Sequence, residues 1–339
     1  MKNRILFLIL TASISLTLSA QLLVSEEPIV LNTETGTIYG TLKVPNNKSS
    51  IPIAIIIAGS GPTDRNGNSQ LTQNNAYKML SDNLFYNGIA TLCFDKRGIA
   101  ESKQAMKDES EIRFDHYIDD VREWINLLSK DKRFSDIIII GHSEGSLIGM
   151  IASENNAIVK KYISVAGMGV SFDVTLKEQM EKQLSGQPQT LKGIIFSYID
   201  KLKNGETISN VPPTLNALFR PSIQPYMISI MKYDPQKEIA KLNIPILILQ
   251  GTTDIQVTAE HADILFAANP KAKKVIIENM NHVLKDCTSN DMQAQSPTYN
   301  NLNIPLNKEL GKAIIEFIKD KKKRYTEVIL YQETVISFV

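Results

Sequence analysis

The 339-residue chain has little cysteine and no excess of either charge. Its 37 basic residues balance 36 acidic ones, whereas a surface that binds nucleic acid needs an excess of lysine and arginine. The two cysteines, Cys93 and Cys287, form no CxxC pair, and no Cys/His cluster offers ligands for a structural zinc ion. The sequence therefore predicts no nucleic-acid partner and no metal, and it favours two unpaired thiols over a disulfide bridge.

The composition is that of a folded protein. Hydrophobic residues make up 43% of the chain and charged residues 22%, which excludes a disordered, collagen-like or multi-span membrane protein. A chain of this length forms either one large α/β domain or two ordinary domains, and both have room for a sizeable core.

The N-terminus indicates export. Two basic residues precede a continuous apolar run at residues 5–10, and the stretch 1–20 ends in the small residue Ala20. This order is typical of a secretory signal peptide that is cleaved before Gln21. An uncleaved membrane anchor is the alternative, because residues 5–24 carry no charge. In both cases we expect the rest of the chain to be exported, either periplasmic or secreted.

Short runs rich in isoleucine and valine alternate with longer amphipathic stretches along the chain. This alternation is typical of a mostly parallel sheet with helices on both faces, so the predicted fold class is α/β. The predicted strands are 29–32 and 36–44 as an opening antiparallel pair, then 51–58, 90–94, 137–140, 162–165, 245–250 and 275–277. The predicted helices are 76–86, 117–129, 146–153 and 307–321.

The alternation stops between residues 170 and 242. This stretch has a helical pattern with several prolines, and it is too long for a simple connection, so we expect an inserted helical cap. The predicted organisation is a signal peptide at 1–20, an α/β core in two parts at 21–169 and 243–324, the cap at 170–242, and a C-terminal tail at 325–339. The tail is either an edge strand or a poorly ordered terminus, and we attach no function to it.

The strongest chemical signal is the pentapeptide Gly141-His142-Ser143-Glu144-Gly145, a G-x-S-x-G sequence. Four isoleucines precede it and a predicted helix follows. A strand, a sharp turn and a helix place the serine on a tight elbow, and glycines on both sides remove the Cβ atoms that would clash there. The pattern predicts that Ser143 is a nucleophile.

A nucleophilic serine needs a base, and the base needs a carboxylate that holds its tautomer. His282 follows the strand 275–277 in a loop at the carboxyl end of the sheet, where active-site loops gather. His142 lies inside the elbow, beside Ser143. His116 and His261 lie in helical patterns that favour structural roles. We therefore expect His282 to be the base.

The carboxylate is expected between the serine and the histidine. Asp254 follows the strand 245–250 directly, and the order Ser143, Asp254, His282 is the order known for α/β hydrolases. Asp286 and Asp234 remain alternatives, because a carboxylate can reach an imidazole from more than one loop.

The loop after strand 51–58 reads Gly-Ser-Gly-Pro-Thr-Asp-Arg over residues 59–65. Glycines there let main-chain amides approach a substrate, so the amides of Ser60 and Glu144 are expected to form an oxyanion hole. The loop lacks the G-K-[ST] ending of a phosphate-binding loop.

These motifs together resemble the α/β-hydrolase superfamily. The resemblance covers most of the chain after the N-terminal segment, and within the superfamily the 59–65 loop and the cap stretch 218–222 are similar to a bacterial carboxylesterase group related to serine aminopeptidase-like hydrolases. It implies a capped fold and Ser-His-Asp chemistry without a cofactor. One departure is Ala100, which stands where many relatives have a second glycine after the Phe-Asp-Lys-Arg-Gly stretch at 94–98.

The sequence thus predicts an exported serine hydrolase that cleaves carboxylic esters of short to medium acyl chains, with a small-molecule acyl ester as its partner. A serine at the elbow excludes haloalkane dehalogenase and epoxide hydrolase chemistry, which need a carboxylate there. A peptidase of the serine aminopeptidase type, an acyl thioesterase and a non-catalytic binding member of the fold are the alternatives.

Overall fold

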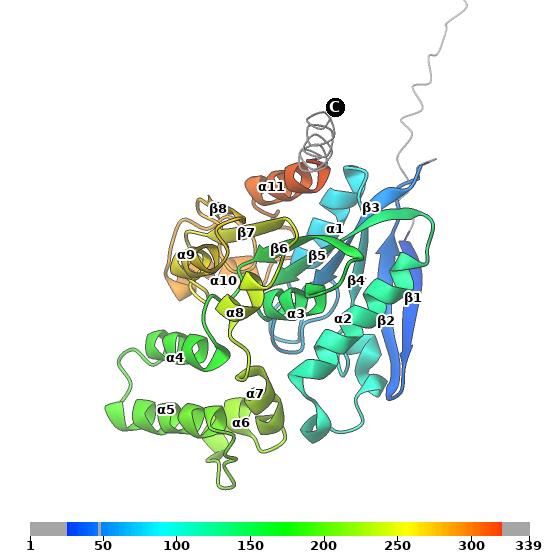
Figure 1. Cartoon of the computed structure of the whole chain (residues 1–339). Helices are drawn as coiled ribbons and strands as arrows, with labels where there is room; N and C mark the ends of the chain where they lie inside the picture. The colour runs from blue at the N-terminus through cyan, green and yellow to red at the C-terminus, as the bar shows by residue number, and fades with distance from the viewer. Residues whose placement is uncertain (1–25, 47–48, 321–339) are drawn as a thin grey trace, which may run out of the picture.

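The computed structural model describes residues 26–46 and 49–320 (Figure 1). Eight strands form one sheet in the order β1-β2-β4-β3-β5-β6-β7-β8. The pairs β1/β2 and β2/β4 are antiparallel, and all other neighbours are parallel. The strands are β1 Glu26–Thr33, β2 Gly36–Lys43, β3 Ile51–Ile57, β4 Ala90–Phe94, β5 Phe134–His142, β6 Val159–Val165, β7 Ile246–Gly251 and β8 Lys273–Ile277. The predicted α/β class with a mostly parallel sheet is confirmed.

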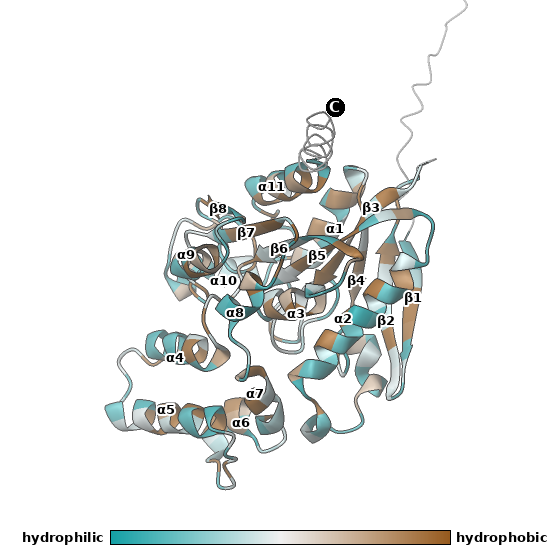
Figure 2. Ribbon diagram, viewed as in Figure 1, coloured by the Kyte–Doolittle hydropathy of each residue, from teal (hydrophilic) through white to brown (hydrophobic). Residues whose placement is uncertain are grey.

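The central strands are apolar on both faces because each face has its own hydrophobic core. In β5, Ile137 and Ile139 belong to the core on one face, whereas Ile138 and Ile140 belong to the core on the other. Figure 2 shows the resulting contrast between hydrophobic central strands and the polar outer faces of the helices. Side chains alternate along a strand, so an unbroken isoleucine run fits only a strand covered on both sides.

Helices cover both faces of the sheet. Helix α1 (Ala76–Tyr86) and helix α11 (Lys308–Lys319) pack on one face. The opposite face is covered by α2 Phe114–Ser129, α3 Glu144–Ser153, α8 Pro235–Ala240 and α9 Ala259–Ala268. The shorter elements of this part of the chain are η1 Ala100–Ala105, η2 Glu109–Glu111 and α10 Met292–Tyr299.

The chain between β6 and β7 forms a mostly helical segment with a small hydrophobic core of its own. Its elements before α8 are α4 Phe172–Gln183, α5 Gln189–Lys203, η3 Pro213–Leu215, α6 Asn216–Phe219 and α7 Gln224–Ile230. Figure 1 shows α4 to α7 gathered on one side of the sheet. Met227 of α7 packs in this small core, whereas Tyr226 and Ile230 pack in the main core. Helix α7 therefore joins the helical segment to the sheet.

Several elements differ in length from the sequence-based expectation. Strand β5 continues to His142 and helix α3 begins at Glu144, so a single residue separates them. Helix α2 begins at Phe114 rather than at residue 117, because the fully buried Phe114 ring extends its apolar face. Helix α10 was not predicted, since its polar sequence has no apolar stripe.

The predicted signal peptide (1–20) and C-terminal tail (325–339) lie outside the described residues. Within the described ranges, no helix combines the length and the apolar character needed to cross a bilayer.

The strand order reverses direction beside β3. Strand β3 lies between β4 and β5, so the chain turns to one side after β3 and crosses to the other side after β4. After β3 the chain continues into α1 on one face of the sheet, and after β5 it continues into α3 on the other face. Ligands of open α/β sheets bind at such a point. The loop that contains Ser60 follows β3, and Ser143 follows β5.

Candidate active site

Ser143 occupies a sharp turn between β5 and α3. Its backbone angles are φ 54° and ψ −122°, a region that residues other than glycine rarely adopt. A hydrogen bond from the Ser143 amide to the Val165 carbonyl, 2.9 Å long, holds the turn against β6. This is the backbone conformation expected of a serine on a strained strand-to-helix elbow.

The two glycines of the pentapeptide permit the close approach of α3 to the sheet. A Cβ atom on Gly141 would lie 2.2 Å from the Gly145 carbonyl oxygen, and a Cβ atom on Gly145 would lie 2.4 Å from the Ile57 carbonyl oxygen. Both contacts are with backbone, which cannot move aside cheaply. The prediction that glycine is required on both sides of the elbow is confirmed.

Asp254 and His282 lie in direct contact. The Nδ1 atom of His282 donates a 2.8 Å hydrogen bond to Oδ2 of Asp254, which also accepts from the Gln250 amide group at 2.9 Å. The other carboxylate oxygen accepts from the backbone amides of Gln256 and Val257, each at 2.9 Å. Because a carboxylate only accepts, the proton of His282 sits on Nδ1 and Nε2 is left to take a proton.

The charge of Asp254 is stabilised in spite of its burial. Burial alone would raise the pKa of the Asp254 carboxyl, but the neighbouring His282 and the hydrogen bonds to both oxygens outweigh it. The pKa therefore lies below its usual value. A carboxylate that stays ionised can orient an imidazole and stabilise it when it becomes protonated.

The two alternative acids have other partners. Asp286 accepts a 2.6 Å hydrogen bond from the Asn307 side chain, and Asp234 caps helix α8 by accepting from the Gln236 amide at 3.1 Å. Of the three carboxylates, Asp254 is the one that contacts His282. Within the described residues, Ser143 Oγ makes no hydrogen bond to His282, a contact that often tightens only when substrate binds.

His142 connects three segments of the site. Its Nε2 atom donates to the His282 carbonyl oxygen at 2.8 Å, so its Nδ1 atom accepts from the Tyr77 hydroxyl, also at 2.8 Å. The Tyr77 oxygen in turn accepts from the Gly59 amide at 3.0 Å. Burial, together with the adjacent His282, lowers the pKa of His142 to about 3. His142 is thus a neutral hydrogen-bonding group, not a base.

The two amides expected to form the oxyanion hole remain free to donate. In the described part of the chain, neither the Ser60 amide nor the Glu144 amide has a hydrogen-bond acceptor. Ser60 is exposed, and Glu144 is the first residue of α3. A helix N-terminus carries a partial positive charge and unpaired amides, both of which favour an anion at this position.

The remaining histidines have structural partners, as expected. The ring of His261 accepts from the Gly169 amide and contacts Glu178, each at 2.9 Å. His116 helps to cap α2 by accepting from the Arg113 amide at 3.3 Å.

Both cysteine thiols are free, as favoured by the sequence, and burial raises the pKa of Cys93 to about 12. Among residues 26–46 and 49–320, no group of three His, Cys, Asp or Glu side chains is arranged to hold a metal ion.

Several supporting side chains of the site were not predicted from the sequence. Tyr77 and Gln250 hold His142 and Asp254, and Gln295 of the unpredicted helix α10 donates to the Thr253 carbonyl at 2.6 Å. These residues lie far from the motifs in sequence or inside ordinary helices and strands, so no local signal marks them. Lys96, described below, lies in a stretch that the resemblance did include.

Ala100 adopts φ +43°, in the left-handed region that favours glycine. Glycine would adopt this conformation without the steric cost of a Cβ atom.

A cavity of about 850 Å³ lies beside Asp254, between α4, α10 and the loop after β7. Its lining includes Gln179 and Lys182 of α4 and Tyr299 of α10, but neither Ser143 nor His282. The cavity therefore borders the acid of the site without including the serine or the histidine.

The sequence model of the serine aminopeptidase family, S33, matches residues 72–195, a range that includes the elbow. The structure aligns with Est1E from Butyrivibrio proteoclasticus with a TM-score of 0.56 at 18% identity, covering 86% of this chain and 99% of that one. The chain therefore has the α/β-hydrolase fold. The match to the S33 family ends before Asp254 and His282, so the site geometry is what links these two residues to the elbow.

Two esterases are also similar to the chain. Esterase EstD of Thermotoga maritima is 23% identical over 251 residues, which cover 72% of this chain and 57% of EstD. The chain thus matches little more than half the length of that relative. The Pyrococcus furiosus esterase Pf2001 aligns with a TM-score of 0.54 at 13% identity over 87% of this chain and 91% of that one.

The buried neutral His142 predicts a pH-dependent stability. Its pKa is about 3 in the folded chain and about 6.5 when unfolded, so between these values only the unfolded chain binds the proton. The free energy of unfolding should therefore fall as the pH drops below 6.5, with His142 contributing about 1.4 kcal/mol per pH unit. Urea unfolding from pH 6.5 to 4.5 measures this slope. In His142→Gln the free energy of unfolding should depend less steeply on pH, by about 1.4 kcal/mol per pH unit. Parallel curves for the two proteins would contradict a buried neutral His142.

Proposed function

We propose that the chain is an exported serine hydrolase that cleaves carboxylic esters of short to medium acyl chains. The observation that carries the proposal is the 2.8 Å hydrogen bond between His282 and the buried Asp254, at the same edge of the sheet as the elbow serine. The esterases EstD, Est1E and Pf2001 support the same class of activity.

In this mechanism Ser143 Oγ attacks the ester carbonyl while Nε2 of His282 takes its proton. Asp254 keeps the His282 proton on Nδ1 and stabilises the imidazolium that forms. The amides of Ser60 and Glu144 donate to the developing oxyanion, where preorganised donors have their largest effect. His282 then returns the proton to the leaving alcohol, and water resolves the acyl-enzyme by the same route.

Two alternatives use the same residues. The match to the serine aminopeptidase family favours a peptidase, and an acyl thioesterase needs no different catalytic group. A non-catalytic binding protein is disfavoured, because such a protein has no need for an ionised carboxylate behind the histidine. One structure of Est1E holds ferulic acid, which is consistent with a small acyl substrate for this chain as well.

A substrate panel tests the activity. We expect wild type to hydrolyse p-nitrophenyl esters faster than aminoacyl-arylamides or acyl thioesters, and Ser143→Ala to lower kcat by roughly 10⁴-fold or more. Asp254→Asn should lower kcat by about 10⁴-fold, because the amide no longer holds the productive tautomer. Steady-state kinetics on purified protein give both values.

Asp286→Asn is the matched control, since its carboxylate bonds to Asn307 and not to His282. It should keep kcat within about twofold of wild type. Equal losses for Asp254→Asn and Asp286→Asn would overturn the choice of acid. If the protein hydrolysed aminoacyl-arylamides and no esters, a peptidase activity would replace the proposed esterase activity.

Export is part of the proposal. It rests on the basic, apolar and small-residue order of residues 1–20, the sequence pattern of a cleavable signal peptide.

Expression of the full chain in a bacterial host tests export. We expect soluble protein outside the cytoplasm whose N-terminal residue is Gln21, as read by N-terminal sequencing. Protein that retains Met1 and is found in the membrane fraction would favour the uncleaved anchor. Active protein found only in the cytoplasm would contradict export.

A further inference from the structure

A buried lysine contacts both halves of the expected oxyanion hole. Lys96 follows β4 and is only 3% exposed. Its ammonium donates to the Gly59 carbonyl oxygen at 2.6 Å and to Glu144 Oε1 at 3.2 Å, and it lies 5.0 Å from the centre of the Tyr117 ring. An ammonium has three donors, so two bonds and one aromatic face account for all of them.

The bond to Gly59 bears directly on the Ser60 amide. The Gly59 carbonyl and the Ser60 N–H belong to one peptide group, which is planar and trans. In a trans peptide these two groups point in opposite directions. An ammonium that holds the carbonyl oxygen on one side therefore fixes where the Ser60 N–H points on the other.

The bond to Glu144 bears on the second amide. Glu144 supplies the other expected oxyanion donor through its backbone, and its buried side chain pairs with the same ammonium. Lys96 thereby connects the loop after β3 to the first turn of α3. One side chain sets the spacing between the two donors.

The loop is held firmly enough for this alignment to matter. The Gly59 amide donates to Tyr77, so both backbone groups of Gly59 are bonded. A Cβ atom on Gly59 would lie 3.0 Å from Cβ of Ser143, so the loop abuts the nucleophile. A shift of the Gly59–Ser60 peptide would thus change the donor position relative to a bound carbonyl.

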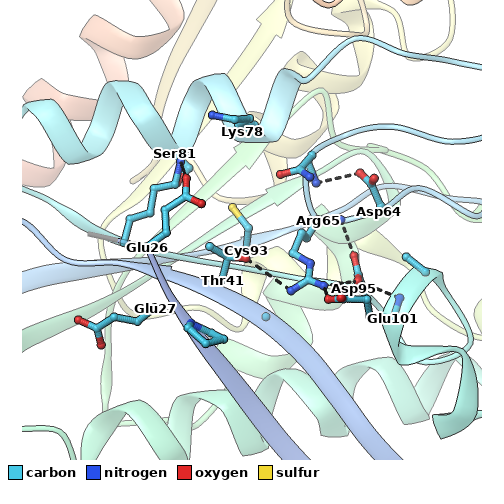
Figure 3. Close-up of a pocket in the computed structure, with 15 residues that line it drawn as sticks. Glu26, Glu27, Thr41, Asp64, Arg65, Lys78, Ser81, Cys93, Asp95 and Glu101 are labelled. Atoms are coloured by element: carbon cyan, nitrogen blue, oxygen red, sulfur yellow. Dashed lines mark hydrogen bonds and ion pairs between the residues drawn. The ribbon is translucent and has the colours of Figure 1, made fainter. Parts of the chain in front are cut away.

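The residue before Lys96 anchors the same loop at a second point. Figure 3 shows Arg65 reaching Asp95 beside a cavity of about 580 Å³. The Asp95 carboxylate accepts from the Arg65 amide at 2.7 Å and pairs with its guanidinium at 2.9 Å. With Asp95 holding Arg65 and Lys96 holding Gly59, two consecutive residues fix both ends of the loop 59–65.

We propose that Lys96 is a positioning residue of the hydrolysis, and that its ammonium aligns the Ser60 and Glu144 amides for the oxyanion. The inference rests on the proposed function, because it assumes acyl transfer at Ser143. A purely structural ion pair has no need of the Gly59 carbonyl, and well-packed apolar residues of similar volume often replace buried pairs without loss of stability. The retained charge is therefore explained by what it orients.

The test uses the double variant Lys96→Met/Glu144→Gln, which leaves no unpaired buried charge. An ester and its thiono analogue, with sulfur in place of the carbonyl oxygen, report on the oxyanion hole because sulfur is a poor hydrogen-bond acceptor. We expect kcat for the ester to fall by about 10²-fold, with KM nearly unchanged. The rate with the thionoester should stay within about threefold of wild type.

Lys43→Met is the matched control. Lys43 is also 3% exposed and pairs with Asp82 and Glu26, but it lies away from the elbow. The Lys43→Met variant should be less stable than wild type in urea unfolding. Its ratio of ester to thionoester hydrolysis rates should equal that of wild type.

Three outcomes would overturn the inference. The first is a folded double variant with wild-type ester kinetics. The second is a double variant whose rates with the ester and with the thionoester fall by the same factor, which indicates a merely structural role. The third is a wild type that hydrolyses no ester, which overturns the proposed function as well. An active wild type combined with either of the first two outcomes removes the role of Lys96 alone.

Discussion

The candidate site depends on one steric constraint, the close approach of helix α3 to the end of β3. A Cβ atom at position 145 would lie 2.4 Å from the carbonyl oxygen of Ile57, which is far too close. Helix α3 can therefore start directly after β5 only because residue 145 is glycine. The turn then forces Ser143 into a rarely adopted backbone conformation and directs the N-terminus of α3 toward the loop after β3. The remaining contacts of the site stabilise this strained arrangement.

Two sets of buried polar contacts provide that support: one is a series of neutral hydrogen bonds, and the other is an ion pair. The chain from Gly59 through Tyr77 and His142 to the His282 carbonyl is neutral, and it links the oxyanion loop, the elbow and the histidine loop. The Lys96–Glu144 pair is ionic and spans the oxyanion loop and α3. A buried polar network of this kind stabilises a single geometry when every member is satisfied, which suits a site that must hold its donors in place before substrate arrives.

Much of this arrangement could be predicted from the sequence because its signals are local. The isoleucine run of β5 and the flanking glycines predict a strand and an elbow within a few residues, and the structure has both. Sequence order alone could not choose among Asp254, Asp286 and Asp234, since that choice depends on how loops distant in sequence fold together. The roles of Tyr77 and Lys96 were also hidden, because their partners are 18 and 37 residues or more away. Helix α10 escaped because polar residues that support a loop leave no periodic pattern.

We propose that Ser143 is a nucleophile activated by His282 and Asp254. The most direct measurement is covalent labelling of the purified chain with a fluorophosphonate, followed by mass spectrometry of the intact protein and of its peptides. We expect one adduct per chain, located on Ser143 and formed far more slowly in Asp254→Asn. No adduct, an adduct on another residue, or undiminished labelling of Asp254→Asn would contradict it.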